Sequence, residues 1–293
     1  MNWDDLKIFL AVARAGQFLG AARRLGLNHA TVARRVSALE RAAGGVLFHR
    51  RTTGAVLTEA GGQLLRIAER VEAEVNGVKA AVAPTETAVA GTVRIGAPDG
   101  FGVAFLASRL AGLSARHPSL SVQLVPVPRS FSLSRNEADI AITVERPTEG
   151  RLVASRLVDY TLGLYASQAY AAAHGLPATA AELHGHRLVG HVPDLVFNPS
   201  LDYATEFSPS WQAGFQVSSA LGQVEAVRAG AGIGILHTFI GRAHDDLVAL
   251  DGFEPVRRAY WMVFHESARP LPQVRAAARF IREIVDDSRA IFA

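Results

Sequence analysis

The sequence contains no cysteine, and this absence excludes disulfide bonds, thiolate metal sites, cysteine nucleophiles and thiol-based redox sensing. It also contains no apolar run near the roughly 20 residues that cross a bilayer. The first residues, Met1–Asp5, are acidic and do not have the pattern of a signal peptide. We therefore expect a cytoplasmic protein without a membrane partner.

Motifs of catalysis and of cofactor binding are absent as well. There is no nucleophile elbow and no phosphate-binding loop. The glycine-rich run 230–234 follows an expected helix and precedes an expected strand, which reverses the order of a dinucleotide-binding loop. His184, His186 and His191 have no acidic partner at metal-ligand spacing, so we expect surface histidines. The sequence thus predicts no enzyme, no cofactor and no metal.

Lysine is scarce, since Lys7 and Lys79 are the only two, and the arginines are unevenly spread. Residues 1–58 carry nine basic and three acidic side chains, whereas 59–90 has a net charge of −2 and 91–293 of −1. A chain of 293 residues fits about two domains, at roughly 100–200 residues each. The charge distribution predicts a polyanion-binding module, 1–58, followed by a neutral domain.

The basic segment has the pattern of a helix-turn-helix. Asn2 can cap a first helix that ends at Gly16, and a short second helix follows at 18–25. Asn28 can cap a third helix that runs to about residue 43. Two helices joined by a short, glycine-containing turn are typical of this motif.

The third helix has two distinct faces. Val32, Val36 and Leu39 fall on one stripe and are expected to face inward. The start and the outer face of the helix supply the expected DNA contacts, which are Asn28, His29, Ala30, Thr31, Ala33, Arg34 and Ser37. Among them, Arg34 could read a guanine with two hydrogen bonds. Taken alone, the same pattern also fits an ordinary solvated helix with scattered arginines.

The next segment predicts a wing. Residues 46–48 and 55–57 can form the arms of a hairpin, with Thr53–Gly54 as the turn. This hairpin would place Arg50 and Arg51 beside the third helix, where they could contact phosphates or a minor groove.

At this point the sequence resembles a known family, the LysR-type transcriptional regulators. The residues that carry the resemblance are Leu6, Phe9, Val12, Ala13, Gly16, Gln17, Phe18, Ala21, Ala22, Leu25, Val32, Arg34, Arg35, Val36, Leu39, Glu40, Leu47, Phe48, Arg50, Leu57, Thr58 and Gly61. The family usually has a Ser-Gln-Pro-Ala-Val-Ser-like stretch where this sequence has 28–33. His29 and Ala33 therefore stand where the family has the Gln and the second Ser to which its base preferences are attributed.

Residues 59–90 are expected to form a linker helix and a hinge. An apolar seam with heptad spacing runs along the helix and consists of Leu64, Ala68, Val71, Val75, Val78 and Val82. Such a seam favours a partner helix, and packing on the chain's own domain is the alternative. The resemblance implies a dimerisation helix, and a homodimer or homotetramer. The hinge is expected at 84–91.

Strands and helices alternate through 91–293, which predicts an α/β fold with mainly parallel sheets. This part resembles the family's effector-binding domain, which is similar to periplasmic binding proteins, at 91–96, 137–142 and 229–236. The resemblance implies two α/β subdomains around a small ligand. Subdomain I would comprise about 91–162 and 267–293, and subdomain II about 163–266.

The cleft is expected at the carboxyl ends of strands and at helix N-termini. This rule selects the candidate effector-binding residues Pro98, Asp99, Gly100, Phe101, Thr143, His191, Ser218 and Ser219. Asp99 allows two interpretations. It either caps the helix that it begins, or it repels an anionic effector and favours a cationic or hydroxyl-bearing one.

Together with the charge split, the resemblance implies a sequence-specific, DNA-binding transcriptional regulator whose binding to double-stranded DNA responds to a small molecule. The alternative is an α/β small-molecule-binding protein or enzyme whose first module mediates assembly. Salt dependence of DNA binding separates the two, because arginine–phosphate contacts weaken steeply with salt.

Overall fold

The computed structural model describes residues 2–51, 54–82, 89–127, 138–148, 150–196 and 198–292. The expected turn residue Thr53, the hinge residues 84–88 and Glu137 lie outside this part of the chain. The chain forms two compact units. The described residues up to 82 belong to the first unit together with 265–272, and all other described residues belong to the second.

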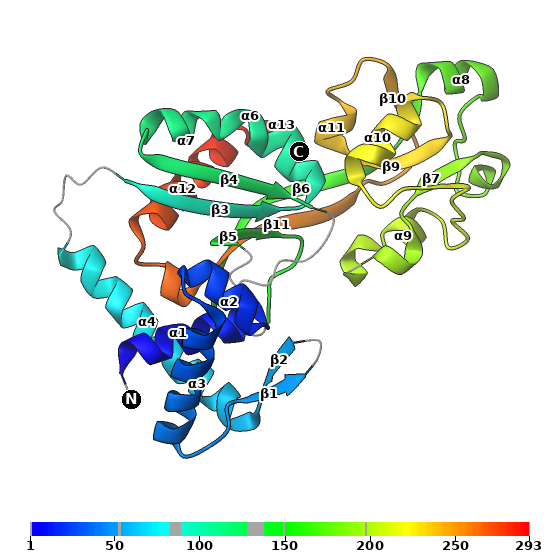
Figure 1. Ribbon diagram of the computed structural model, residues 1–293. Helices are drawn as coiled ribbons and strands as arrows, with labels where there is room; N and C mark the ends of the chain where they lie inside the picture. The colour runs from blue at the N-terminus through cyan, green and yellow to red at the C-terminus, as the bar shows by residue number, and fades with distance from the viewer. Residues whose placement is uncertain are drawn as a thin grey trace. The chain divides into compact units, whose positions relative to one another are not determined.

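The first unit begins with the three predicted helices, α1 (Trp3–Ala15), α2 (Phe18–Leu25) and α3 (His29–Ala43) (Figure 1). Both predicted caps are present. The side-chain oxygen of Asn2 accepts a hydrogen bond from the Asp5 N–H at 2.8 Å, and that of Asn28 accepts one from the Thr31 N–H at 2.7 Å. A glycine in the left-handed conformation follows each helix.

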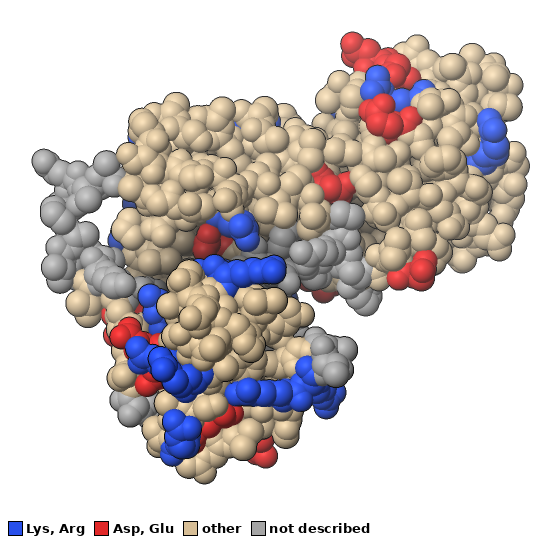
Figure 2. All heavy atoms as spheres, in the orientation of Figure 1, with Lys and Arg blue, Asp and Glu red and all other residues tan. Residues whose placement is uncertain are grey.

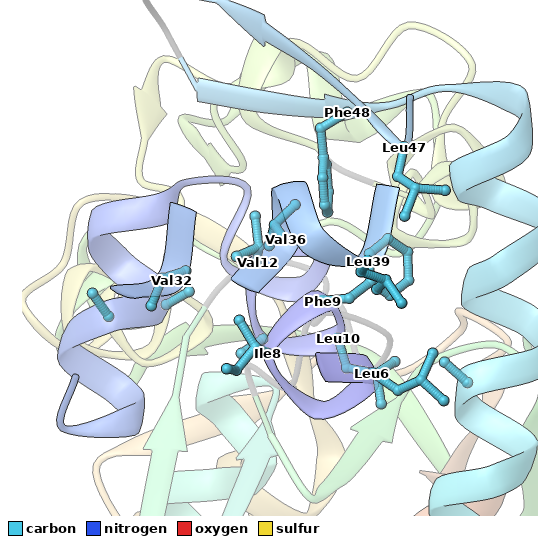
Figure 3. Close-up of a cluster of buried hydrophobic side chains, with 14 residues drawn as sticks. Leu6, Ile8, Phe9, Leu10, Val12, Val32, Val36, Leu39, Leu47 and Phe48 are labelled. Carbon is cyan, nitrogen blue, oxygen red and sulfur yellow. The ribbon is translucent and has the colours of Figure 1, made fainter. Parts of the chain in front are cut away.

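A single apolar core joins these helices to the segment that follows them (Figure 3). Val32, Val36 and Leu39 are completely buried, as the stripe on α3 predicted. Phe9 of α1 packs against Phe48, with ring centroids 5.2 Å apart. Because α3 uses its apolar stripe inside the unit, its opposite face remains open to solvent.

The predicted hairpin is present, with strands that differ slightly from the expected arms. Strand β1 (Phe48–Arg51) pairs antiparallel with β2 (Gly54–Leu57). Arg50 and Arg51 therefore lie on a strand. Gly54, expected in the turn, begins β2 with a φ of 145°, and a Cβ there would lie 2.5 Å from the carbonyl oxygen of Gly16. This close approach fixes the hairpin to the end of α1, where Ala55 N–H donates to the same carbonyl at 2.7 Å.

The linker helix α4 (Glu59–Val82) follows the hairpin directly. The Thr58 hydroxyl accepts a hydrogen bond from the Gly61 N–H at 2.9 Å and so caps the helix. Gly61 is needed for packing, because a Cβ there would lie 2.2 Å from the carbonyl oxygen of Leu47. The first turn of α4 is thus pressed against the base of the hairpin.

Among its described residues, the second unit is built on one nine-stranded sheet. Its strands are β3 (Gly91–Ala97), β4 (Leu120–Pro126), β5 (Ile140–Thr143), β6 (Leu152–Ser167), β7 (Leu188–Gly190), β8 (Phe215–Gln216), β9 (Ile233–His237), β10 (Leu247–Ala249) and β11 (Val256–His265). They are arranged in the order β4-β3-β5-β11-β6-β9-β7-β8, and β10 pairs with β6.

The sheet is parallel in its two halves and antiparallel where the halves meet. On one side β3 pairs parallel with β4 and β5, and on the other β7 pairs parallel with β8 and β9. The long strands β6 and β11 cross between the halves and pair antiparallel with β9 and β5. The expectation of mainly parallel sheets therefore holds within each half but not at the crossover.

Helices alternate with these strands along the chain, as the α/β pattern predicted (Figure 1). They are α5 (Asp99–Phe101), α6 (Ala107–Arg109), α7 (Ala111–Arg116), α8 (Gln168–His174), α9 (Ala204–Phe207), α10 (Ala220–Arg228), α11 (Thr238–Gly241), α12 (Pro272–Asp287) and α13 (Arg289–Phe292). A π-helical turn, η1 (Gly102–Leu106), interrupts the helix expected at 102–115. Within the described residues, no helix combines the length and the apolar character needed to span a membrane.

Candidate nucleic-acid interface and effector cavity

The arginines of the first unit have two kinds of surroundings. Arg35 forms an ion pair with Asp5 at 2.9 Å, and the buried Arg14 pairs with Glu72 on α4 through two hydrogen bonds of 2.9 and 2.5 Å. Arg34, on the outer face of α3, is exposed and has no ion-pair partner among the described residues. Arg34 is therefore available to an external anion, whereas Arg14 and Arg35 hold helices together.

The start of α3 presents the short side chains that the sequence predicted there. His29 and Ala30 are exposed, and Thr31 and Ala33 are half-buried. The His29 ring stands edge-on to Phe18, with centroids 6.2 Å apart. Asn28 uses its side-chain oxygen in the helix cap, so the amide nitrogen is the part left for another contact.

The wing is tied to α3 through Arg50. Its guanidinium lies 4.6 Å from the centre of the Phe18 ring and donates a hydrogen bond to the Ser37 hydroxyl at 3.4 Å. Arg51, the next residue of β1, is exposed. Figure 2 shows basic side chains at the wing and along the helical face of this unit. We call the exposed Arg34 of α3 and the exposed Arg50 and Arg51 of β1 together the basic face. Arg50 contacts Ser37, which lies one helical turn after Arg34 on α3.

The apolar seam of α4 is divided between two uses. Ala68 is fully buried in the core of the first unit, and Leu64 packs against that core. Farther along, Val71 and Val75 are half-buried, and Val78 is 62% exposed. The side chain of Val82 lies outside the described part. The start of the seam therefore packs on the chain's own domain, which was the alternative to a partner helix. The later part of the seam is half-buried at Val71 and Val75 and exposed at Val78.

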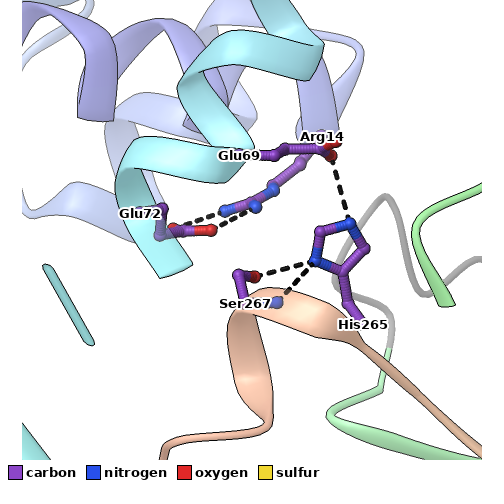
Figure 4. Close-up of polar contacts among 5 residues, drawn as sticks. All are labelled: Arg14, Glu69, Glu72, His265 and Ser267. Carbon is purple, nitrogen blue, oxygen red and sulfur yellow. Dashed lines mark hydrogen bonds and ion pairs between the residues drawn. The ribbon is translucent and has the colours of Figure 1, made fainter. Parts of the chain in front are cut away.

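A buried polar cluster surrounds Arg14 (Figure 4). Residues 265–272 contribute His265, whose Nδ1 accepts a hydrogen bond from the Ser267 N–H at 3.2 Å. Because Nδ1 is an acceptor, the ring proton belongs on Nε2, which faces the buried Glu69 at 3.6 Å. Burial opposes the charge of Glu72, but hydrogen bonding and the charge of Arg14 outweigh burial and lower the pKa of Glu72.

A small cavity in the second unit brings together most of the predicted effector-binding residues. Its lining consists of Pro98, Asp99, Gly100, Val144, His191, Leu195, Val196, Leu201, Tyr203, Ser218, Ala220 and His237. Five predicted residues are in this lining. Ser219, although not part of it, donates a hydrogen bond from its hydroxyl to Asp99 at 2.6 Å.

Two predicted residues lie elsewhere. Phe101 is fully buried in an aromatic cluster, with ring centroids 5.1 Å from Phe105 and 4.4 Å from Tyr260. Thr143 donates its hydroxyl proton to the Glu145 carbonyl at 2.6 Å, and the following residue, Val144, lines the cavity. Proximity to a strand end therefore led to residues near this cavity, but it did not predict which side chains line it.

Tyr203 and His237 line the cavity but were not predicted. His237 is the last residue of β9, so the rule that selected Asp99 could have found it. Tyr203 lies between the short 3₁₀ turn Pro199–Leu201 and the four-residue helix α9, where the sequence has no periodic pattern. Nothing in the sequence could have placed Tyr203 here.

Asp99 does not cap the helix that it begins. Its Oδ2 accepts hydrogen bonds from the Ser219 hydroxyl and, at 3.4 Å, from the Leu221 N–H. Ser219 is the N-cap of α10, and its oxygen accepts from the Gly222 N–H at 3.1 Å. The Asp99 carboxylate therefore occupies the N-terminus of α10, a position that favours negative charge.

The two histidines beside Asp99 are neutral near pH 7. Burial lowers the pKa of His237 to about 4, and it also lowers the pKa of His191, although the nearby Asp99 opposes both shifts. The Nε2 of His191 lies 3.3 Å from the Tyr203 hydroxyl. Burial likewise raises the pKa of Tyr203, so this phenol stays protonated. The imidazoles and the phenol can thus bind a ligand through hydrogen bonds without adding charge.

A larger pocket adjoins this cavity through shared residues. It has a volume of about 820 Å³, whereas the small cavity has about 40 Å³. His191, Val196, Leu201 and Tyr203 line both. A pocket of this size fits a small organic molecule, since ligand pockets are typically about 300–1,000 Å³.

Two family models match consecutive parts of the chain. Residues 3–62 match the family model described as bacterial regulatory helix-turn-helix protein, lysR family. Residues 86–286 match the model described as LysR substrate binding domain.

Individual relatives are transcriptional regulators by name. An HTH-type transcriptional regulator of Xanthomonas campestris is 32% identical over 63% of this chain, and the match spans 54% of that protein's length. The regulator CrgA of Neisseria meningitidis is 30% identical over 64% of this chain and 63% of its own. The Mau operon transcriptional activator of Paracoccus denitrificans is 26% identical over 99% of both chains.

Solved structures show the same fold. The structure of CrgA from Neisseria meningitidis superposes with a TM-score of 0.60 at 24% identity and covers 97% of this chain and 99% of that one. Full-length OxyR from Pseudomonas aeruginosa gives 0.72 at 17% identity and covers 97% and 95%. With both family models matched along most of its length, the chain belongs to the LysR family of bacterial regulators.

Proposed function

We propose that this protein is a transcriptional regulator that binds specific sites in double-stranded DNA, acts in the cytoplasm and responds to a small molecule. The basic face carries this proposal. It consists of exposed arginines on α3 and β1, and α3 buries its apolar stripe inside the first unit. In a helix-turn-helix protein, the outer face of this helix enters the major groove and the wing contacts the backbone.

The proposed division of labour follows the chain. The DNA-binding domain comprises 1–58, the linker and hinge 59–90, and the effector-binding domain 91–293, with the two sheet halves as subdomains. Effector binding at Asp99, His191 and Ser218 would shift the population of conformations in that domain. This shift would change how the DNA-binding domains of two copies are placed on DNA.

Self-association belongs to the same proposal. Ile67 is 46% exposed and Val78 is 62% exposed, and their spacing of eleven residues places them on one face of α4. Val71 lies between them on that face. We propose that this face contacts the helix of a second copy. It keeps Val71 and Val78 of the predicted seam, and Ile67 takes the place of Leu64 and Ala68, which pack in the first unit.

Purified full-length protein first selects fragments of genomic DNA, and its affinity for the selected site is then measured against salt. Arg34→Ala should weaken binding to that site by about 1–3 kcal/mol and relax specificity, because a bidentate contact to a base is lost. Arg35→Ala removes the same charge from the same helix but only an ion pair with Asp5, so it should change DNA affinity little.

Three outcomes are informative. A steep fall in affinity with salt supports several arginine–phosphate contacts. Equal losses for Arg34→Ala on selected and random DNA would make Arg34 a phosphate contact. Negligible DNA affinity at low salt would refute the proposal of a DNA-binding regulator. It would favour the alternative, an α/β small-molecule-binding protein or enzyme whose first module mediates assembly.

A further inference from the structure

The lining of the small cavity includes a carboxylate of the protein itself, the side chain of Asp99. The Asp99 carboxylate accepts hydrogen bonds from the Ser219 hydroxyl and the Leu221 N–H, which are the donors that a ligand carboxylate would use at the start of α10. A carboxylate ligand would have to displace Asp99 or lie beside it. Either arrangement costs free energy, because like charges repel and the helix has one N-terminus.

No basic side chain offsets this charge in the lining. The described residues that line the small cavity include one ionised group, Asp99, and no lysine or arginine. Those that line the larger pocket include Asp202 and again no lysine or arginine. His191 and His237 stay neutral, so Asp99 and Asp202 are the charged side chains among the described residues that line these two adjoining spaces.

Two further side chains near Asp99, Tyr203 and His191, can accept a hydrogen bond from a ligand. Tyr203 and His191 line both spaces, and the Tyr203 hydroxyl lies 3.3 Å from the Nε2 of His191. The small cavity, about 40 Å³, holds a single polar head group, and the larger pocket, about 820 Å³, holds the body of a ligand. Trp211 and Ile235 provide apolar surface in that larger pocket.

We propose that the effector is an organic cation, an amine or guanidinium compound, whose charged head pairs with Asp99 and whose body occupies the larger pocket. This inference rests on the proposed function, because it names the chemical class that the regulator would sense. The head group donates hydrogen bonds to the Asp99 carboxylate, a charge-assisted pair that is stronger than a neutral one.

The test compares matched ligands on the full-length protein. Putrescine, agmatine and benzylamine are titrated by calorimetry against succinate and benzoate, and thermal shifts are recorded in parallel. At least one amine should bind about tenfold or more tightly than the carboxylates. The preference should weaken with added salt, because it is electrostatic.

Asp99→Asn is the decisive variant. Asparagine keeps a side-chain oxygen that can accept hydrogen bonds from Ser219 and Leu221, but it carries no charge. The hydrogen bonds at the start of α10 should therefore be retained, whereas the preference for amines should disappear. Asp251→Asn, which removes an exposed carboxylate outside both linings, should leave the preference unchanged.

Three results overturn the inference: tighter binding of carboxylates, no binding of any amine, or an amine preference that survives in Asp99→Asn. DNA binding of the same preparations, measured without ligand, keeps the two proposals apart. Site-specific DNA binding without amine binding refutes the proposal of a cationic effector but not the proposal of a DNA-binding regulator. Amine binding that Asp99→Asn abolishes supports the cation, even if DNA binding is absent.

Discussion

Arg14, Arg34 and Arg50 lie within one small unit but have different surroundings. Arg14 is buried against Glu72, Arg50 stacks on Phe18, and Arg34 is exposed. Identical side chains thus hold the linker helix, position the wing and face the solvent. Net charge alone could locate the basic domain but could not separate these roles, because each depends on what lies opposite in three dimensions.

His237 makes stability depend on pH at the scale of one residue. Its folded pKa of about 4 lies below the ordinary value of 6.5, so the unfolded chain takes up a proton first as pH falls. The stabilisation is present above pH 6.5 and is lost between there and pH 4. Between pH 7.5 and pH 5, the protonation of this histidine should lower the free energy of unfolding of the effector-binding domain by about 2 kcal/mol.

Denaturant unfolding at the two pH values measures this loss. His237→Gln should show a smaller loss than wild type, since glutamine does not titrate. His174→Gln, at an exposed histidine of the same unit, serves as the matched control and should show the same loss as wild type. An identical pH dependence in His237→Gln and wild type would contradict the assignment.

At the scale of the element, the start of α4 shows how packing overrides helix propensity. Gly61 and Gly62 both weaken a helix intrinsically, by roughly 1 kcal/mol each relative to alanine. In the structure, a Cβ on Gly61 would collide with the carbonyl of Leu47, whereas a Cβ on Gly62 meets nothing within 4 Å.

The two glycines therefore predict opposite effects of one substitution. Gly62→Ala should raise the free energy of unfolding by up to about 1 kcal/mol. Gly61→Ala should lower it by about 1–3 kcal/mol, as overpacking does, because a backbone carbonyl cannot yield cheaply. Thermal unfolding of the pair against wild type is the measurement, and equal shifts would refute the packing argument.

Elements with a regular period were predictable from the sequence, and irregular ones were not. The stripe on α3 and the cap at Asn28 are local features, and both are present. Strand ends led to Asp99 and His191, since the carboxyl ends of strands meet in the α/β fold. Tyr203 comes from a segment without a period, and the burial of Ala68 depends on packing between distant segments, so neither could be deduced.

At the scale of the whole molecule, the open face of α4 predicts how copies associate. Val78→Glu should convert the oligomer to smaller species, because a charge cannot be buried unpaired in an apolar helix contact. Sedimentation of wild type and variant measures this change. Leu19→Glu introduces the same charge at an exposed residue of α2, 51% exposed, and should leave the mass unchanged. An unchanged mass for Val78→Glu would contradict the proposed contact along this face of α4.

The polar cluster around Arg14 has a consequence for protein engineering. Regulators of this kind invite chimeras in which one head is fused to another sensor at the linker. Here a head cut out at residue 90 would keep Glu69 and Glu72 but lose His265 and Ser267, their partners from 265–272. The unit that can be transplanted intact is discontinuous in sequence, so a functional chimera has to carry this late segment, or a replacement for it, along with the head.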